Sequence, residues 1–499
     1  MNDGVGGGGH TRLAAHTRAT MDIAKEYAAL PAGEPVRLAK RTSNLFRTRT
    51  RAPAGHRLDV SAFGGVIDVD PVTRTARVQG MATYENLVDA TLAQGCMPLV
   101  VPQLRTITIG GAVTGLGIES SSFRSGLPHE SVIEAEILTG AGDVVVARPE
   151  GRHADLFRTF PNSYGSLGYA LSLVIELERV RPYVALRHLR FRDLTRLVEA
   201  VGEIMTGRTY RGEPVDFLDG VVFSRDESYL VLGSWSETVG SQGTPSDYTG
   251  QDVFYRSIQS RERDVLTVRD YLWRWDTDWF WCSRAFGAQR PAVRRLWPKR
   301  WLRSDVYWKL VAFEGRHGLV AAVDRRRGRP GRERVVQDVE IPLGRTGEFL
   351  DWFLREVPIE PVWLCPVQLR PQVAPQAASQ AAAQTTPQIS PQTTRQTKPP
   401  ADGAPPWPLY PMRPGEPYVN VGFWSTVPIA PGRADGDVNR GIEAAVTRLG
   451  GHKSLYSDAF YSEEDFHALY GGAAYRPVKE RYDPEGRLPS LYDKAVRAR

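Results

Sequence analysis

The sequence predicts an α+β protein made of two or three packed units. Short apolar runs of strand length are joined by tight turns, and single amphipathic helices interrupt them. The 499 residues exceed what one compact core accommodates. A composition of 41% hydrophobic and 24% charged residues is that of an ordinary folded protein. A shift towards tryptophan and arginine beyond Arg181 places a domain boundary near residue 180.

Charge and cysteine content exclude several classes of protein. The 63 basic and 57 acidic side chains are too nearly balanced to indicate nucleic acid, although a net charge of +6 favours an anionic ligand or lipid. Three distant cysteines, Cys96, Cys282 and Cys365, predict neither a disulfide framework nor a zinc site, and no metal is expected. No signal peptide or transmembrane run is evident, so we expect a cytoplasmic protein whose membrane contact, if any, is peripheral.

The first unit is expected over residues 36–180, after a glycine-rich, disordered segment at 1–35. "GGVIDVDPVTRTARVQG" predicts two strands around a turn. In "TYENLVDATLAQGC", Thr83 caps a helix that Gly95 ends, and the strand "MPLVV" follows. "VIEAEILTGAGDVVVA" predicts a hairpin. A short helix, a second glycine-bearing loop and a strand then fill "HADLFRTFPNSYGSLGYALSLVIELERV".

The second unit is expected over residues 181–370, where "FLDGVVFSRDESYLVLGSW" predicts antiparallel strands. Residues 371–406 are low in complexity, rich in Gln, Ala, Pro and Thr, and predict a flexible insertion. Residues 407–499 complete the second unit. They contain the strand "YVNVGFWSTVP", the helix "NRGIEAAVTRLG", and a capping box in which Ser462 and Asp465 begin another helix.

The stretch "GGAVTGLGIESSSFRSG", from Gly110 to Gly126, exposes an unusual amount of bare backbone. Glycines at 110, 111, 115 and 117 leave N–H groups accessible to an anionic ligand. The spacing is neither that of a dinucleotide-binding Rossmann unit nor that of a phosphate-binding loop. A large anionic cofactor and a simple tight turn therefore both remain open at this point.

The succession of these elements resembles the FAD-binding domain of the vanillyl-alcohol oxidase and p-cresol methylhydroxylase type of flavoprotein. The motifs "PQLRTITIGGAVTGLG" and "DLF…GSLG" carry that resemblance. "GLGIESSSFRSGL", "WLCP", "LYSDAFYSEEDF" and "LPSLYDKA" look like the delta-24-sterol reductase branch, called diminuto/dwarf in plants. The resemblance implies a two-subdomain FAD-binding domain with an α+β substrate (cap) domain, and a C-terminal segment that returns to the flavin.

Carried over residue by residue, the resemblance places the FAD against two loops. The implied cofactor-binding residues are Thr106, Thr108, Gly110, Gly111, Gly115, Gly117, Glu119, Ser120, Ser121, Ser163, Gly165 and Ser166. Helix or turn capping is the alternative role for the serines. Upstream, "KRTSNLFR" stands where such folds have a glycine-rich pyrophosphate loop; here Thr42, Ser43 and Asn44 would donate to phosphate, with charge from Lys40 or Arg41.

The mode of flavin attachment is predicted from the same loops. Many relatives tether the flavin through a His or Cys, but "KRTSNLFR" and "GIESSSF" contain neither. His129, just beyond, is interpreted as a polar loop residue. We therefore expect non-covalent FAD.

Seven tryptophans gather among arginines in "RDYLWRWDTDWFWCSRAFG" and "RRLWPKRWLRSDVYWKL". They indicate a core, a hydrophobic substrate mouth, or a surface that rests on a membrane. Nucleic-acid binding by stacking lacks a basic domain or module to support it. Cys365 in "WLCP" is interpreted as a small apolar residue rather than a nucleophile.

The function implied is flavin-dependent redox chemistry, with NADPH reducing the FAD and a carbon–carbon double bond of a sterol or isoprenoid-like substrate being reduced. Tyr475 and Lys479 are the candidate catalytic residues, as proton donor and as stabiliser of reduced flavin; a solvated helix face is the alternative for Lys479. A sugar, alditol or alcohol oxidase or dehydrogenase on the same scaffold is the other enzyme reading. A lipid-binding protein that has lost its flavin is the non-catalytic one. The oligomeric state is left open.

Overall fold

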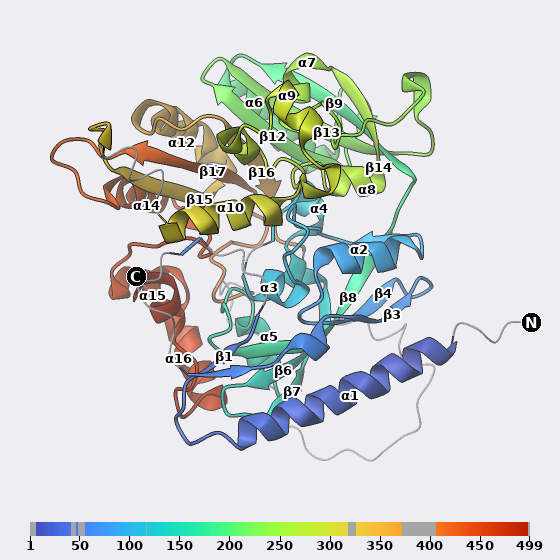
Figure 1. Ribbon diagram of the computed structural model, residues 1–499, viewed down its shortest axis with the longest axis vertical. Helices are drawn as coiled ribbons and strands as arrows, with labels where there is room; N and C mark the ends of the chain where they lie inside the picture. Colours follow the sequence, from blue (N-terminus) through green and yellow to red (C-terminus); the bar gives the residue numbers. More distant parts are fainter. Residues whose placement is uncertain are drawn as a thin grey trace, which may run out of the picture.

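The computed structural model describes residues 6–40, 46–47, 55–115, 117–317, 326–371 and 406–497. Two antiparallel sheets form two layers (Figure 1). The lower, N-terminal layer holds a six-stranded sheet in the order β3-β4-β8-β6-β7, with β5 also pairing with β8. Its strands are β3 (Val66–Asp70), β4 (Thr75–Gln79), β5 (Cys96–Pro98), β6 (Val132–Thr139), β7 (Val144–Ala147) and β8 (Gly168–Arg179). A separate parallel pair, β1 (Val36–Leu38) and β2 (His56–Leu58), lies beside it.

The upper layer is built on an eight-stranded sheet in the order β14-β9-β13-β12-β16-β17-β15-β18. These strands are β9 (Tyr183–Phe191), β12 (Phe217–Ser224), β13 (Glu227–Ser236), β14 (Arg263–Thr267), β15 (Arg332–Pro342), β16 (Val362–Val367), β17 (Tyr418–Pro428) and β18 (His452–Lys453). The chain passes from one sheet to the other between Arg179 and Tyr183, beside the predicted boundary at residue 180.

The two faces of the upper sheet are covered differently. Three amphipathic helices, α6 (Leu194–Gly207), α12 (Leu343–Glu356) and α14 (Asp437–Arg448), bury their apolar sides on one face. The opposite face shares a core with the lower layer, and Trp273 and Trp275 lie within this core. Because apolar contacts join the layers, groups from both meet at an interface that is shielded from water.

Shorter helices complete both layers. The lower layer carries α2 (Tyr84–Leu92), α3 (Ile109–Thr114), α4 (Ser122–Ser125) and α5 (Ala154–Thr159). The upper layer adds α7 (Phe254–Ser260), α8 (Val268–Leu272), α9 (Pro291–Leu296) and α10 (Ser304–His317). The C-terminal α15 (Glu463–Leu469) and α16 (Gly472–Tyr482) run down the side of the lower layer, where α16 contacts α5 (Figure 1).

Local sequence signals are confirmed where a cap or a hairpin defines them. Thr83 Oγ1 accepts the Asn86 N–H at 3.3 Å and begins α2. Ser462 Oγ accepts the Asp465 N–H at 3.1 Å and begins α15. The hairpins β3–β4, β6–β7 and β12–β13 occur as predicted. The α+β class is confirmed as well.

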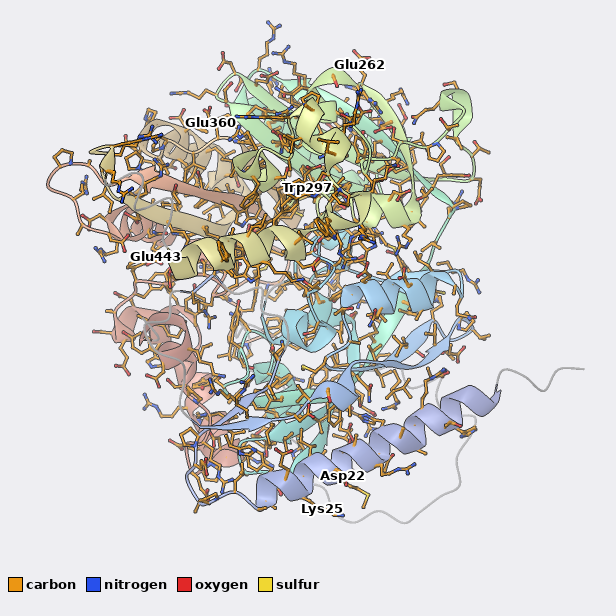
Figure 2. All side chains as sticks on the ribbon, in the orientation of Figure 1. Asp22, Lys25, Glu262, Trp297, Glu360 and Glu443 are labelled. Carbon is orange, nitrogen blue, oxygen red and sulfur yellow. The ribbon has the colours of Figure 1, made fainter. Side chains whose placement is uncertain are left out.

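The disorder predicted for residues 1–35 is wrong over the described part of that segment. Residues Gly6–Ala28 form the helix α1, which buries Ile23 and Tyr27 while Asp22 and Lys25 lie on its outer side (Figure 2). The Tyr27 hydroxyl donates to Gly140 O at 2.7 Å. The glycines at the start of the chain suggested disorder, but the helical spacing of the later apolar residues outweighs them because one face packs on the sheet.

Two further predictions concern the low-complexity insertion and membrane-spanning helices. The low-complexity insertion falls almost entirely on residues 372–405, outside the described residues. None of the helices in the described ranges combines the length and the apolar composition that crossing a bilayer requires.

Candidate active site between the layers

The first loop of the site, residues 106–121, is called here the glycine loop. Its central helix α3 begins at Thr108, whose Oγ1 accepts the Gly111 N–H at 3.2 Å. Gly110 N donates to Gly80 O at 2.9 Å, and a side chain at Gly110 would collide with that carbonyl. Gly110 is therefore required for the close approach of α3 to the end of β4.

The other glycines of the loop also meet close neighbours. A Cβ at Gly115 would press on the Gly111 carbonyl and the Tyr164 ring, and one at Gly117 would meet Pro102 and Pro128. At Gly111 a Cβ would meet only Thr108 Oγ1 closely, with Lys40 Nζ beyond it. Lys40 Nζ donates to Thr108 Oγ1 at 3.5 Å, which places an amino group beside the start of α3, and burial lowers the pKa of this lysine. Thr106 is half-buried in the turn that leads into α3.

The polar end of the glycine loop points into the upper layer. Glu119 Oε1 accepts from Arg274 Nη2 at 2.8 Å, and the same nitrogen lies 2.9 Å from Asp219 Oδ2. Ser120 Oγ donates to Glu119 Oε1 at 2.7 Å and lies 2.6 Å from the Tyr271 hydroxyl. All these side chains are buried. Burial raises the pKa of Glu119, while Arg274 opposes that rise.

Ser121 also has an internal partner, since its Oγ donates to Leu99 O at 2.8 Å. The hydroxyls of Thr108, Ser120 and Ser121 are therefore engaged within the protein. The network identifies Arg274, Asp219 and Tyr271 as partners that the sequence did not reveal.

The second loop, residues 162–166, is called here the serine loop. Asn162 and Tyr164 adopt positive φ angles of 61° and 50°, and Gly165 adopts 74°. Ser163 Oγ and the Tyr164 hydroxyl are buried and have no hydrogen-bond partner among the described residues. Leaving a buried hydroxyl unpaired costs about 1–3 kcal/mol, so this pair is suited to a ligand that supplies the missing bonds.

The C-terminal segment holds the serine loop by its backbone. Lys479 Nζ donates to Ser166 O at 2.8 Å and Leu488 O at 2.7 Å, and it also pairs with Asp483. Its three donors are thereby engaged, which leaves none for a ligand in this arrangement. Lys494 Nζ donates to Tyr164 O at 3.0 Å and Gly165 O at 2.8 Å.

Tyr475, on α16, also packs beneath this loop. Its hydroxyl accepts the Leu491 N–H at 3.2 Å, and the Ser166 side chain lies close to it. Burial raises the pKa of Tyr475 to about 12. A phenol with so high a pKa keeps its proton at neutral pH, as a proton donor must.

The segment predicted as a pyrophosphate loop is described only at its ends. Thr42, Ser43 and Asn44, like Arg41, lie outside the described residues. Phe46 N donates to Tyr456 O at 2.9 Å, and Arg47 Nε donates to Leu455 O at 2.8 Å. The Arg47 guanidinium carbon also lies 4.4 Å from the centre of the Tyr164 ring. This segment is thus joined to both layers.

Aromatic rings from both layers meet beside Phe46. Its ring centre lies 5.8 Å from that of Trp279, 4.7 Å from that of Trp308 and 5.9 Å from that of Tyr456. We call Phe46, Trp279, Trp308 and Tyr456 the aromatic wall. Of the seven clustered tryptophans, Trp273, Trp275, Trp279 and Trp281 are buried, which confirms the core reading for those four.

Comparison with known proteins adds two findings. A model described as an FAD binding domain matches residues 14–148, a segment that contains the glycine loop. Over 474 residues the chain is 24% identical to the Delta(24)-sterol reductase of Arabidopsis thaliana, covering 89% of this chain and 77% of that protein. These findings support a likeness of this chain to the Delta(24)-sterol reductase branch of the FAD-binding flavoproteins.

Two other relatives match this chain over very different lengths. The Delta(24)-sterol reductase of Homo sapiens is 24% identical over 446 residues, covering 87% of this chain and 76% of that protein. Cytokinin dehydrogenase 9 of Oryza sativa subsp. japonica is 26% identical over 163 residues, only 33% of this chain and 30% of that protein. The flavoprotein is an FAD-dependent oxidoreductase.

The residues present fit FAD in two respects. The Ser163 and Tyr164 hydroxyls, which have no partner among the described residues, offer donors to a polar ring system, and the Lys40 amino group lies beside α3, where the negative pyrophosphate would favour its protonated form. The glycine loop brings its backbone close to both, although packing alone accounts for Gly110 and Gly117.

The structure corrects the interpretation of His129. It is buried at 3% exposure, stacks edge-on to Trp407 at 4.6 Å, and has a pKa that burial lowers to about 3. It is a neutral core residue rather than a polar loop residue, because the strand and helices around it exclude water. The prediction of non-covalent FAD stands as a prediction.

Two carboxylates missed by sequence reasoning lie across from the serine loop. Asp338 and Glu340 are buried on β15, and both influence the titration of Tyr164. Their only sequence signal is that two acidic residues alternate in an otherwise apolar strand, "RVVQDVEIP". Acidic residues are seldom buried without a function or a partner.

Proposed function

We propose that this flavoprotein reduces an isolated carbon–carbon double bond in a sterol or isoprenoid-like substrate. The observation that carries the proposal is the extent of the similarity. It covers 87–89% of the chain for sterol reductases of plant and animal origin, and so includes the upper, substrate-facing layer. The similarity to a cytokinin dehydrogenase covers 33% of the chain and supports only the cofactor domain.

The aromatic wall supports an apolar substrate. Phe46, Trp279 and Trp308 offer ring faces and edges where the two layers meet, and such surfaces gain free energy by removing hydrocarbon from water. A sugar or alditol requires instead several free polar groups to bind its hydroxyls. The wall therefore favours a sterol over the polyol of the alternative enzyme reading.

Bound FAD supplies the hydride in this reaction. The chain's own groups would bind and orient it: Lys40 and residues 42–44 at the pyrophosphate, and the hydroxyls of Ser163 and Tyr164 at the ring system. NADPH is proposed as the electron donor. Tyr475 and Lys479 remain proposed to lie beside the flavin. Lys479 would act by holding the Ser166 carbonyl in place.

A peripheral membrane contact is proposed at α9 and α10. Leu296, Trp301 and Phe313 expose 85%, 48% and 55% of their surfaces, and the exposed cations of that region are Arg295, Lys299, Arg300 and Lys309. Apolar side chains surrounded by cations suit the headgroup region of an anionic membrane. A cytoplasmic location with this face against a membrane would give access to a sterol.

The test of the proposed function is an anaerobic flavin titration. NADPH is added to the yellow holoprotein, and a delta-24 sterol follows. Bleaching by NADPH and return of the oxidised spectrum with the sterol are expected. Bleaching by an alcohol or sugar, with no reoxidation by the sterol, would assign the protein to the oxidase or dehydrogenase reading. Colourless protein that cannot be reconstituted with FAD would support the non-catalytic lipid-binding reading.

A further inference from the structure

The starting observation is the pair of buried carboxylic acids on β15. Asp338 and Glu340 are two residues apart, so their side chains lie on the same face of the strand. Asp338 is 7% exposed and Glu340 is fully buried. Their layer also supplies Trp279 and Tyr456 to the aromatic wall.

Asp338 is connected to the aromatic wall through Tyr456. Asn420 Nδ2 donates to Asp338 Oδ1 at 3.1 Å, and the Tyr456 side chain hydrogen-bonds to the same carboxyl group. The Tyr456 hydroxyl in turn accepts from Trp424 Nε1 at 2.9 Å. Gly422 stands opposite Asp338 in the sheet register and leaves the space that this carboxyl group occupies.

Glu340 lies two residues beyond Asp338 on β15. Its Oε1 accepts from Ser454 Oγ at 2.6 Å and from the Tyr410 hydroxyl at 3.3 Å, and its Oε2 lies 3.4 Å from His452 Nε2. Asp338 is thus hydrogen-bonded to Asn420 and Tyr456, and Glu340 separately to Ser454 and Tyr410. Tyr164 of the serine loop faces the same two carboxyl groups from the lower layer.

Burial shifts the pKa of each of these groups in the direction that favours its neutral form. Burial raises the pKa of Asp338 to about 6 and that of Glu340 well above its usual value, and it lowers the pKa of His452 to about 3. Burial likewise raises the pKa of Tyr456. The other titratable groups around the two acids are Tyr164, backed by Arg47, and Tyr410, Tyr461, Tyr470 and Cys365.

We propose that Tyr456 and Asp338 form the proton donor of the reductase, with Tyr456 giving its hydroxyl proton to the substrate carbon and Asp338 replacing it. The assignment rests on the proposed function. Adding hydrogen across the double bond needs a hydride, which carries both electrons from NADPH through FAD, and one proton. The Tyr456 O–H bond breaks as the C–H bond forms, and the Asp338 carboxyl proton moves to the Tyr456 oxygen. Solvent then reprotonates Asp338.

Tyr456 suits this part better than Tyr475 does. It belongs to the aromatic wall that would hold the substrate, and its proton can be renewed from an adjacent acid. The Tyr475 hydroxyl contacts the Leu491 N–H and Ser166, and its ring makes no contact with the wall within the described residues.

The test uses the FAD-loaded variants Tyr456→Phe and Asp338→Asn, with Tyr482→Phe as the matched control for loss of a buried tyrosine hydroxyl. Each is reduced anaerobically with dithionite, so that the electron donor has no influence, and is mixed with a delta-24 sterol. Reoxidation slower by about 100-fold or more is expected for the first two variants only, with FAD affinity unchanged. The Asp338→Asn variant should also lose the pH dependence of reoxidation near pH 6. Reoxidation at the wild-type rate by either variant would overturn the proposal.

A second measurement needs neither substrate nor flavin. Infrared titration of the FAD-free protein should show a protonated carboxylic acid that ionises near pH 6, present in Tyr456→Phe and absent in Asp338→Asn. Its absence from the wild-type protein would overturn the role of Asp338. If the sterol fails to reoxidise wild-type flavin while this band is present, the proposed function fails, whereas the assignment of the titrating acid to Asp338 holds.

Discussion

The glycine loop and the serine loop differ in how they use their polar groups. In the glycine loop, Thr108, Ser120 and Ser121 bond to partners inside the protein, and the glycines allow close packing. In the serine loop, Ser163 and Tyr164 keep buried hydroxyls without partners among the described residues, while lysines hold the backbone. The glycine loop is the more conspicuous motif in the sequence, yet its polar groups and glycines serve packing within the protein more than the serine loop does.

This contrast predicts that the glycine loop stabilises the fold and that the serine loop binds the cofactor. A loop whose polar groups are satisfied gains little from a ligand, whereas unpaired buried hydroxyls gain a hydrogen bond when one binds. Mutations in the glycine loop should therefore reduce folding stability, and mutations in the serine loop should reduce cofactor affinity.

The largest effect is expected where the glycine loop meets the upper layer. Arg274→Met leaves Glu119 and Asp219 buried without their cation, which should lower the free energy of unfolding by about 3–5 kcal/mol. Denaturant unfolding of the FAD-free protein measures this loss. Arg196→Met removes an exposed ion pair with Glu199 and should have almost no effect. A loss below about 1 kcal/mol at Arg274 would mean that the network does not hold the layers together.

The pH dependence of stability should have opposite signs in the two layers. The raised pKa of Asp338 means that the native protein holds a proton that the unfolded chain releases, so this contribution is lost as pH rises from about 4 to 6. About two pKa units correspond to roughly 3 kcal/mol. The lowered pKa of His129 means that the unfolded chain takes up a proton first, so stability is lost as pH falls from about 6.5 towards 3.

Unfolding free energies of Asp338→Asn and His129→Gln across this range, each compared with wild type, measure the two contributions. Asparagine at 338 should remove the decline above pH 4, and glutamine at 129 should remove the decline below pH 6.5. Parallel pH profiles for the two variants would contradict the opposite signs.

A smaller effect is expected from Gly110→Ala. The new methyl group collides with Gly80 O and should cost about 1–3 kcal/mol, with weaker FAD binding as a consequence of the displaced loop. Gly441→Ala, in the middle of α14 and without close neighbours, should instead be neutral or stabilising. Thermal unfolding of the pair measures both. Equal melting temperatures would show that α3 can move without cost.

The smallest change in stability is expected from Ser163→Ala, because its hydroxyl has no partner to lose among the described residues. FAD affinity should fall about tenfold, as expected for one hydrogen bond. Ser121→Ala should do the reverse, reducing stability by about 1 kcal/mol through its bond to Leu99 O while leaving FAD affinity nearly unchanged. Fluorescence titration with FAD and denaturant unfolding separate the two outcomes. Equal effects on FAD affinity would remove the distinction between the loops.

The sequence predicts those features that depend on contacts between residues close together in the chain. The caps at Thr83 and Ser462 and the tight hairpins depend on contacts only a few residues apart, and all of them were predictable. The helix α1 was missed although its apolar spacing carries the signal, since glycine content was given more weight than periodicity.

The proton-donor pair shows what the sequence could not reveal. Asp338 is paired with Gly422 in the sheet register, and the partners lie on either side of the low-complexity segment. Nothing local in "QDVEIP" indicates which residues will surround its acids. The arrangement of Tyr456 beside Asp338 is fixed only once β15 lies between β17 and β18.

The serine loop is secured by residues made much later in synthesis. Tyr164 O is held by Lys494, 330 positions downstream, and Ser166 O by Lys479, 313 positions downstream. A ribosome that adds about 5–20 residues per second needs on the order of 15–65 s to travel that distance. A nascent chain therefore makes these two contacts only after Lys479 and Lys494 have been synthesised.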